Sequence, residues 1–253
     1  MLKVALRRDA APFGYIDRAG NWTGYCRDFA ADLQSYVSQT IRKTIDVDLV
    51  ELPSTLANRF SLVQENIVHL ECGPNTIRQD IEGVTFSLPL LVSGAQFLVK
   101  QERIDRENPN PRLADVRVAV LPETTTEEFI RETFPQAEVI PFAGPTGRHE
   151  AVTALATGQV DVLASDGILS MGELLRQNRP LADYALEPER PLTCEFYGLI
   201  LPAGDPDWQD LVNTFISNTH SERLSRQEPN RLFADQITIL DYCLNQQTDE
   251  PLE

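Results

Sequence analysis

The sequence has few of the side chains that bind metal ions, and it lacks several local signatures of catalysis. It contains three histidines and four cysteines, and no two cysteines form a C-x-x-C pair. Because zinc sites draw on clustered cysteine and histidine ligands, we expect no metal site. Neither a phosphate-binding loop nor a nucleophile elbow occurs, which argues against nucleotide hydrolysis and acyl transfer. The sequence therefore predicts a protein with no cofactor and no catalytic activity.

Basic residues and long apolar runs are also scarce. The 22 lysines and arginines are outnumbered by 38 aspartates and glutamates, so the net charge is −16. Nucleic acids and anionic membrane surfaces attract basic proteins, so we expect neither as a partner. No apolar run is long enough to span a bilayer. Residues 1–3 lead directly into a predicted strand and residues 251–253 resemble a cloning remnant, so we expect a mature domain without its signal peptide.

The first half of the chain has the pattern of a parallel α/β sheet. A length of 253 residues with 42% hydrophobic content is enough for two domains. Apolar runs alternate with amphipathic stretches whose apolar residues recur at helical spacing. Strands are predicted over 3–6, 47–52 and 67–71, and helices over 28–42 and 58–64. This order favours strands that lie parallel, with helices as the connections.

A second α/β pattern follows and is inserted into the first. Strands are predicted over 116–121, 138–142 and 161–164, then a returning strand over 196–201 and closing helices over 208–224 and 232–245. We therefore expect one lobe to comprise residues 1–98 and 195–253, and a second lobe to comprise residues 99–194. Two chain crossings make a hinge, and a cleft between two lobes is a common place for a small ligand.

The stretch after the third strand carries a candidate ligand contact. Pro74 and Asn75 interrupt regular structure, and Thr76 is predicted to cap a short helix with Arg78 in its first turn. A cation at that position opposes the helix dipole, so Arg78 is expected to face another group. A ligand carboxylate suits it, because guanidinium binds carboxylate through two parallel bonds. The alternative is an arginine that is simply solvated in a loop.

Several short motifs occur in the order typical of one family. They are Arg7 with Pro12–Tyr15 and Gly24-Tyr25, Asn58-Arg59 with Glu71-Cys72-Gly73, Gly83–Ser87, Thr124–Glu127 with Asp161 and Asp166, and Glu195 with Tyr197-Gly198. On these motifs the chain resembles the extracellular solute-binding proteins of family 3, which serve ABC importers of polar amino acids. The likeness is greatest to the glutamate/aspartate-binding branch.

The resemblance implies a fold and a function. The fold is the type II periplasmic-binding fold, with two α/β lobes that close on a ligand. The ligand is a free L-amino acid, with acidic side chains favoured, and the partner is an ABC transporter permease. We expect a monomer located in the periplasm or outside the cell.

The resemblance also implies roles for residues on both lobes. Arg78 corresponds to the arginine that holds the α-carboxylate, although Asp80 occupies the usual position six residues before Phe86. Thr125, at a helix start, supplies further carboxylate contacts, and Glu123 stands where the family has glycine. Asp166 corresponds to the aspartate that binds the α-ammonium group. Its alternative role is to cap the following helix.

Two further arginines are expected to read the ligand side chain. Arg7 occupies the position that is arginine in the acidic-amino-acid branch, and Arg148 falls where that branch has a cationic or polar contact. The alternative is that both are ordinary surface residues. Arg59 is expected to support the pocket. The remaining expected ligand contacts are Tyr15, Gly73, Asn75 and Thr76.

The four cysteines allow several arrangements. An even number in an exported protein suggests two disulfides with three possible pairings, and four buried free thiols are the alternative. The resemblance favours Cys26–Cys72 within the first lobe. It also favours Cys194–Cys243, which is similar to a disulfide in the ligand cores of ionotropic glutamate receptors.

Two other functions compete with transport. The same domain occurs as the ligand-binding sensor of receptors and kinases. A dehydratase similar to cyclohexadienyl dehydratase is the enzymatic alternative, and it would need a general acid such as Glu71, Glu123 or Glu195.

Overall fold

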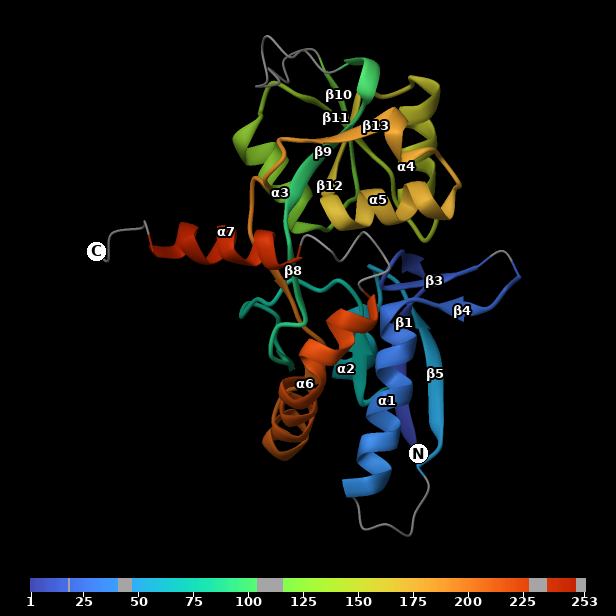
Figure 1. The fold of residues 1–253 in the computed structure, drawn as a ribbon, viewed down its shortest axis with the longest axis vertical. Helices are drawn as coiled ribbons and strands as arrows, with labels where there is room; N and C mark the ends of the chain where they lie inside the picture. The colour runs from blue at the N-terminus through green and yellow to red at the C-terminus, as the bar shows by residue number, and fades with distance from the viewer. Residues whose placement is uncertain (18, 41–46, 104–115, 228–235, 249–253) are drawn as a thin grey trace. The chain divides into compact units, whose positions relative to one another are not determined.

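The computed structural model describes residues 1–17, 19–40, 47–103, 116–227 and 236–248. The chain folds into two compact units, one comprising Met1–Leu91 with Phe196–Glu228 and the other Val92–Glu195 with Pro229–Glu253 (Figure 1). Each unit combines helices with a five-stranded sheet, so the predicted α/β class is confirmed. Parts of several predictions lie outside the described residues: the end of the first helix at 41–42, residues 232–235, and residues 251–253.

The sheet of the first unit is built around β1, a strand that is buried except at Lys3. The strand order is β5-β1-β6-β15-β7. β1 (Leu2–Arg7) lies parallel to both β5 (Leu49–Ser54) and β6 (Leu70–Cys72), whereas β15 (Ile200–Pro202) runs antiparallel to β6 and to β7 (Val84–Phe86). Val4, Ala5 and Leu6 are completely buried, as expected for a central parallel strand covered on both faces.

In the described part of this unit, three helices and a small antiparallel sheet complete the fold. The helices are α1 (Tyr25–Thr40), α2 (Arg59–Gln64) and α6 (Pro206–Gln227). α1 and α6 lie side by side (Figure 1), and Phe215 contacts Phe29 and Tyr36 with ring centroids 5.3 and 5.1 Å apart. The small sheet contains β2 (Asp9–Ala10), β3 (Gly14–Ile16) and β4 (Trp22–Thr23), and it follows directly from the end of β1.

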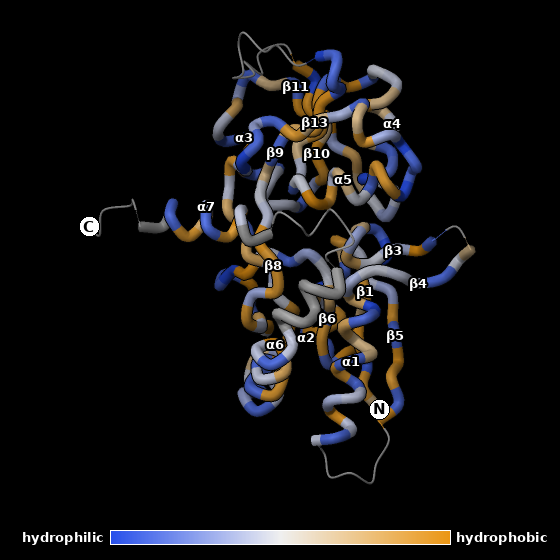
Figure 2. The backbone as a smooth tube through the Cα atoms, in the orientation of Figure 1, coloured by the Kyte–Doolittle hydropathy of each residue, from blue (hydrophilic) through white to orange (hydrophobic). Residues whose placement is uncertain are grey.

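The second unit has the strand order β11-β10-β12-β9-β13. β10 (Arg117–Val120) lies parallel to β11 (Glu138–Pro141) and β12 (Val162–Asp166), and β9 (Ala95–Lys100) lies antiparallel to β12 and β13 (Tyr184–Glu187). The helices that contact this sheet are α3 (Thr125–Thr133), α4 (Gly147–Thr157) and α5 (Gly167–Arg176). Two short 3-10 turns, η1 (Gln101–Arg103) and η2 (Leu181–Asp183), lie in the same unit. Figure 2 shows the central strands in hydrophobic colours. The core here contains Phe97, Val118, Val120, Ile130, Val162 and Ala164.

The chain passes between the units within β8 (Leu91–Ser93) and β14 (Glu195–Tyr197), which pair with each other. The unit boundaries differ from the predicted lobes, which placed the first crossing after residue 98 and all of 195–253 in the first lobe. α7 (Gln236–Thr248) belongs to the second unit. The reason is covalent, because Cys243 on α7 is bonded to Cys194.

The short helix predicted after Thr76 is not formed, so that prediction is wrong. Thr76 forms an antiparallel bridge with Tyr197, and the Ile77 N–H donates to the carbonyl of Phe196 at 2.8 Å. The backbone groups that a helix would need are therefore used in an extended pairing. Of the helices in the described residues, none has the length and apolar content needed to cross a membrane. The described residues also contain no cluster of three potential metal ligands.

Candidate functional site

Three strands of the first unit end side by side in a row of polar residues. In the parallel register Arg7 of β1 lies opposite Ser54 of β5, and Leu6 lies opposite Cys72, the last residue of β6. Arg7, Ser54 and Gly73 therefore stand at the same carboxyl edge of the sheet. Ligands of open parallel sheets bind at this edge.

Arg7 is a buried cation with an internal partner. Its side chain is 1% exposed, and its Nε donates to Asp9 Oδ1 at 2.7 Å. Burial alone would lower the pKa of Arg7, but the charge of Asp9 and then that of Glu71 outweigh it and raise the pKa. Its Nη1 is buried and has no hydrogen-bond partner among the residues that the structure describes. The alternative of a plain surface arginine is thereby excluded.

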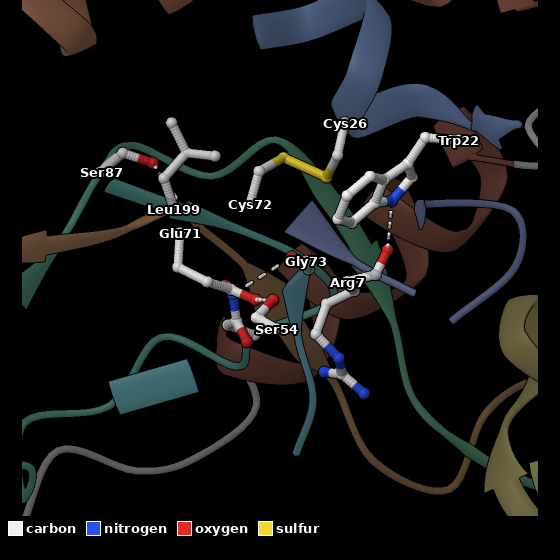
Figure 3. Close-up of a disulfide and its surroundings, with 10 residues drawn as sticks. Arg7, Trp22, Cys26, Ser54, Glu71, Cys72, Gly73, Ser87 and Leu199 are labelled. Atoms are coloured by element: carbon white, nitrogen blue, oxygen red, sulfur yellow. Dashed lines mark hydrogen bonds between the residues drawn. A yellow bond between two sulfur atoms is a disulfide. The ribbon is translucent and has the colours of Figure 1, made fainter. Parts of the chain in front are cut away.

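Asp9 is held in place by the small sheet beside β1. Asp9 pairs with Tyr15 between β2 and β3, and Tyr15 pairs in turn with Thr23 of β4. Tyr15 is half-buried, so the structure brings this predicted contact residue next to the Arg7–Asp9 ion pair through the backbone. The Trp22 indole N–H donates to the carbonyl of Arg7 at 3.2 Å and fixes the end of β1 (Figure 3).

Glu71 is a fully buried carboxyl group beside Arg7. Its Oε1 accepts a hydrogen bond from Ser54 Oγ at 2.6 Å, and its Oε2 accepts one from Asn75 Nδ2 at 2.5 Å. Desolvation raises the pKa of Glu71 despite the charge of Arg7 and both hydrogen bonds. Figure 3 shows Ser54 against the Glu71 carboxyl group and Arg7 beside Gly73.

Asn75 lies next to this carboxyl group and is fixed by it. Its Nδ2 donates to Glu71, so its Oδ1 must point elsewhere, and that oxygen is buried with no partner in the described part of the chain. The carbonyl of Asn75 accepts from the Gly198 N–H at 3.0 Å. Within the described residues, Arg7 Nη1 is thus a spare donor and Asn75 Oδ1 a spare acceptor, and a polar ligand can satisfy both.

Arg59 adds a second cation from α2. Its Nη1 donates to the carbonyl of Leu56 at 3.0 Å, and its guanidinium lies 4.6 Å from the centroid of the Phe60 ring. Burial, followed by the charge of Arg7, lowers the pKa of Arg59 to about 10. It therefore stays protonated at neutral pH and adds to the positive charge near Arg7.

Arg78 is engaged within its own loop. Its Nε and Nη2 both donate to the carboxylate of Asp80, and the two side chains are 30% and 57% exposed. This is the edge of the guanidinium that would bind a carboxylate through two bonds. Asp80, which stands where the resemblance implies an arginine, therefore holds the Arg78 side chain. The contact of Arg78 with a ligand stays a prediction. The same loop leaves Thr76 half-buried and bridged to Tyr197.

The second unit places Arg148 beside Ser165, the residue before Asp166. Arg148, at the start of α4, is 5% exposed, and its Nη1 donates to Ser165 Oγ of β12 at 2.6 Å. Asp166 is the next residue and the last of β12. It occupies the N-cap position of α5, but its side chain makes no capping hydrogen bond. A surface role for Arg148 is excluded, and the capping role does not account for Asp166.

The first turn of α3 lies at the carboxyl edge of this second sheet. Thr124 is the N-cap, and its side chain accepts from the Glu127 N–H at 3.1 Å. Thr125 is the first helical residue and is half-buried. Glu123 has φ of 62°, a left-handed conformation that glycine adopts without strain. The glycine that the resemblance implies at this position would adopt this conformation without strain, and Glu123 retains the turn.

Both predicted disulfides are confirmed. Cys26 is bonded to Cys72 and Cys194 to Cys243, and no described cysteine is free. Cys26–Cys72 connects the start of α1 to the residue before Gly73, so it anchors the loop that carries Asn75.

The sequence did not identify every residue of the first-unit cluster. Asp9 and Ser54 were not recognised, and Glu71 was considered only as a possible acid. The sequence did indicate that Glu71 is unusual, because it is a charged residue within the apolar strand VHLEC. Asp9 and Ser54 become partners of Arg7 and Glu71 only through strand pairing.

Comparison with known proteins defines the class. The chain belongs to the bacterial extracellular solute-binding proteins of family 3, whose model matches residues 2–227. The glutamate/aspartate import solute-binding protein of Escherichia coli (strain K12) is 24% identical over 223 residues, which are 87% of this chain and 72% of that protein.

Solved structures are similar over nearly the whole chain. An ancestral amino acid-binding protein, described as a precursor of cyclohexadienyl dehydratase, has a TM-score of 0.72 at 22% identity and covers 93% of this chain and 94% of its own. A mutant of ArgBP from T. maritima has a TM-score of 0.69 at 20% identity, with coverage of 94% and 95%. These similarities confirm the predicted type II periplasmic-binding fold.

Proposed function

We propose that this protein captures a free polar L-amino acid, with acidic side chains preferred, for an ABC importer. Family membership over residues 2–227 supports capture of a solute. The acidic preference is supported by the buried guanidinium of Arg7, whose Nη1 has no internal partner in the described residues. The relative from Escherichia coli is a glutamate/aspartate import protein, which agrees with this preference.

The proposed contacts bind three parts of the ligand, which are the side-chain carboxylate, the α-carboxylate and the α-ammonium group. Arg7 binds the side-chain carboxylate, because a buried N–H donor of a cation is best satisfied by an anionic oxygen. The N-terminal turn of α3 at Thr125 binds the α-carboxylate, since free N–H groups at a helix start favour anions. Arg78 joins it by exchanging the carboxylate of Asp80 for that of the ligand. Asp166 binds the α-ammonium group, and Arg148 supports it from the neighbouring Ser165.

A thermal-shift screen of the twenty amino acids tests the proposal. The protein is first unfolded and refolded to remove carried-over ligand. Saturation at about 100 times Kd should add about 2.7 kcal/mol to the free energy of unfolding. For a chain of this size, that corresponds to a rise in Tm of about 5–10 °C with L-glutamate or L-aspartate.

Two variants and one control test which residues are responsible for the rise in Tm. Arg7→Gln should reduce the shift with acidic amino acids more than with neutral ones, and Asp166→Asn should abolish the shift with all of them. The exposed neighbour Arg8 provides the control, because Arg8→Gln keeps the buried cluster intact. A refolded protein whose Tm responds to none of the twenty amino acids would overturn the proposal.

The proposed location is the periplasm or the cell exterior, with an importer permease as partner and a monomer as the working unit. A sensor domain of a receptor or kinase would bind the ligand in the same way. The complete gene separates the two, because a sensor carries membrane-spanning segments in the same polypeptide.

One observation favours an enzyme as the second candidate. Glu71 is buried and its pKa is raised, as in general acids of active sites, and one similar structure is described as a precursor of a dehydratase. Both Glu71 oxygens are already hydrogen-bonded to Ser54 and Asn75, which favours a role in charge balance. Turnover of hydroxylated ring acids by the purified protein would support the enzyme instead.

A further inference from the structure

The balance of charge around Glu71 bears on which ligands the first unit can accept. The carboxyl group receives hydrogen bonds only from neutral donors, Ser54 Oγ and Asn75 Nδ2, in the part of the chain that the structure describes. Its charge is therefore compensated from a greater distance by Arg7 and Arg59, which both lower the pKa of Glu71.

Among the described residues, four charged groups from four elements form the cluster around Glu71 and add to zero. Arg78, whose charge also acts on Arg59, is paired with Asp80, so those two charges cancel. Arg7 lies on β1, Asp9 on β2 and Arg59 on α2, while Glu71 itself lies on β6. Asp9 already binds the Nε of Arg7. With Glu71 ionised, two cations face two anions. The spare Nη1 of Arg7 thus belongs to a site that is electrically neutral, although the donor itself is cationic.

A ligand carboxylate at Arg7 changes this balance. It adds a third anion to a water-poor cluster, where like charges strongly disfavour joint ionisation. Uptake of one proton by Glu71 from solvent restores neutrality. The protonated carboxyl group can then donate to Ser54 Oγ, because a hydroxyl group both donates and accepts. A ligand carboxamide adds no charge and requires no proton.

We infer that Glu71 sets the charge selectivity of this site, opposing acidic side chains when it is ionised and admitting them by taking up one proton. The inference rests on the proposed binding of an amino-acid side chain at Arg7. Burial of Glu71, its two neutral hydrogen-bond donors and the pairing of Arg7 with Asp9 carry it.

The experiment compares L-glutamate with its neutral isostere L-glutamine. Calorimetry of the whole protein between about pH 5.5 and 8.5 measures both affinities, and two buffers of different ionisation enthalpy report proton uptake. The free side chain of glutamate stays ionised in this range. Changes in the charge of the shared α-groups or of His69 affect both ligands alike and cancel in the ratio of the two affinities.

In the wild type, the glutamate/glutamine affinity ratio should fall as pH rises, by up to about tenfold per pH unit once Glu71 is ionised. In Glu71→Gln the ratio should be independent of pH and about tenfold or more higher near pH 8. The side-chain amide introduced by Glu71→Gln can accept a hydrogen bond from Asn75 and donate one to Ser54, so both hydrogen bonds at this position are preserved. Asp9→Asn provides a second variant, which should also raise the ratio by removing the other anion.

The outcomes separate the two proposals. Glutamate binding with a pH-independent ratio in the wild type, or with the same pH dependence in Glu71→Gln, would overturn this inference alone. Absence of binding heat with either amino acid at every pH would overturn the proposed function and this inference with it.

Discussion

At the scale of single residues, Gly73 determines where the Arg7 side chain can lie. A Cβ atom at Gly73 would lie 2.4 Å from Arg7 Cγ and 3.1 Å from Glu71 Oε1. Because Arg7 Cγ lies close to the backbone, rotation of the guanidinium end of the side chain would not relieve this contact. The absence of a side chain at Gly73 therefore lets Arg7 pass across the end of β6 beside Glu71.

Gly73→Ala should displace Arg7 and damage both stability and binding. Overpacking of a filled site typically lowers the free energy of unfolding by about 1–3 kcal/mol, and the Tm shift with acidic amino acids should be lost. Denaturant unfolding and the thermal-shift assay measure the two effects. Gly198→Ala is the matched control, because its Cβ would meet Ile77 Cγ1 at 2.9 Å and leave Arg7 in place. Equal loss of binding in both variants would contradict this role of Gly73.

For single residues, the sequence named candidate ligand contacts, and those contacts stay predictions. Arg7 and Arg148 were both singled out, and both are buried cations with polar partners. Asp9 was missed, because its contact with Arg7 depends on how β2 turns back from β1. Arg78 was expected to be available for a ligand, and its pairing with Asp80 could not be read from two residues of a loop.

At the scale of secondary-structure elements, Asp161 connects three separate pieces of the second unit. Its carboxylate accepts from the Arg117 N–H of β10 at 3.1 Å and from the Arg117 guanidinium at 2.9 and 3.0 Å. It also accepts from Arg103 of η1. Arg117 further donates to the carbonyl groups of Gln159 and Gly158 after α4. One carboxylate thus fixes the starts of β10 and β12 relative to η1.

Asp161→Asn should destabilise the protein in a pH-dependent way. The hydrogen bonds from Arg117 hold the pKa of Asp161 well below its usual value of 3.8. The stabilisation is therefore complete above that value and is lost as pH falls through the lower pKa of the folded state. Near pH 7 the variant should lose about 1–2 kcal/mol, allowing for partial exposure, and the loss should shrink below about pH 4.

Denaturant unfolding at several pH values checks this expectation. Asp210→Asn on the exposed surface of α6 serves as the control and should have little effect at any pH. A difference between wild type and Asp161→Asn that is unchanged from neutral to acidic pH would contradict the ionic role.

Element-level prediction from sequence was accurate where local periodicity decides the outcome. The strands and helices of both α/β patterns were placed, because buried strands read as apolar runs and helices as amphipathic stretches. The helix expected after Thr76 was wrong, because the competing partner is Tyr197, far along the sequence. Local signals such as a capping threonine cannot reveal a long-range backbone pairing of this kind.

At the scale of the whole molecule, the chain is divided into two units and each contains one disulfide. Cys26–Cys72 spans 46 residues of the first unit, and Cys194–Cys243 spans 49 residues and attaches α7 to the second. The alternation of strands and helices predicted two α/β patterns. It did not predict the membership of α7, because a helix carries no local sign of the unit to which it is bonded.

Removal of the two disulfides should therefore have separable effects. Each closes a loop of similar length, so each Cys→Ala pair should lower the free energy of unfolding by about 2–5 kcal/mol. Cys26→Ala with Cys72→Ala should also weaken ligand binding, because Cys72 precedes Gly73 and the loop of Asn75. Cys194→Ala with Cys243→Ala should instead speed hydrogen exchange in α7 and leave Arg7 and Glu71 undisturbed. Denaturant unfolding, thermal shift with L-glutamate and peptide-resolved hydrogen exchange distinguish the two variants.

Thiol titration tests the pairing itself. The native protein should react at none of its four cysteines, and reaction of the native protein at any of them would contradict the assigned pairing.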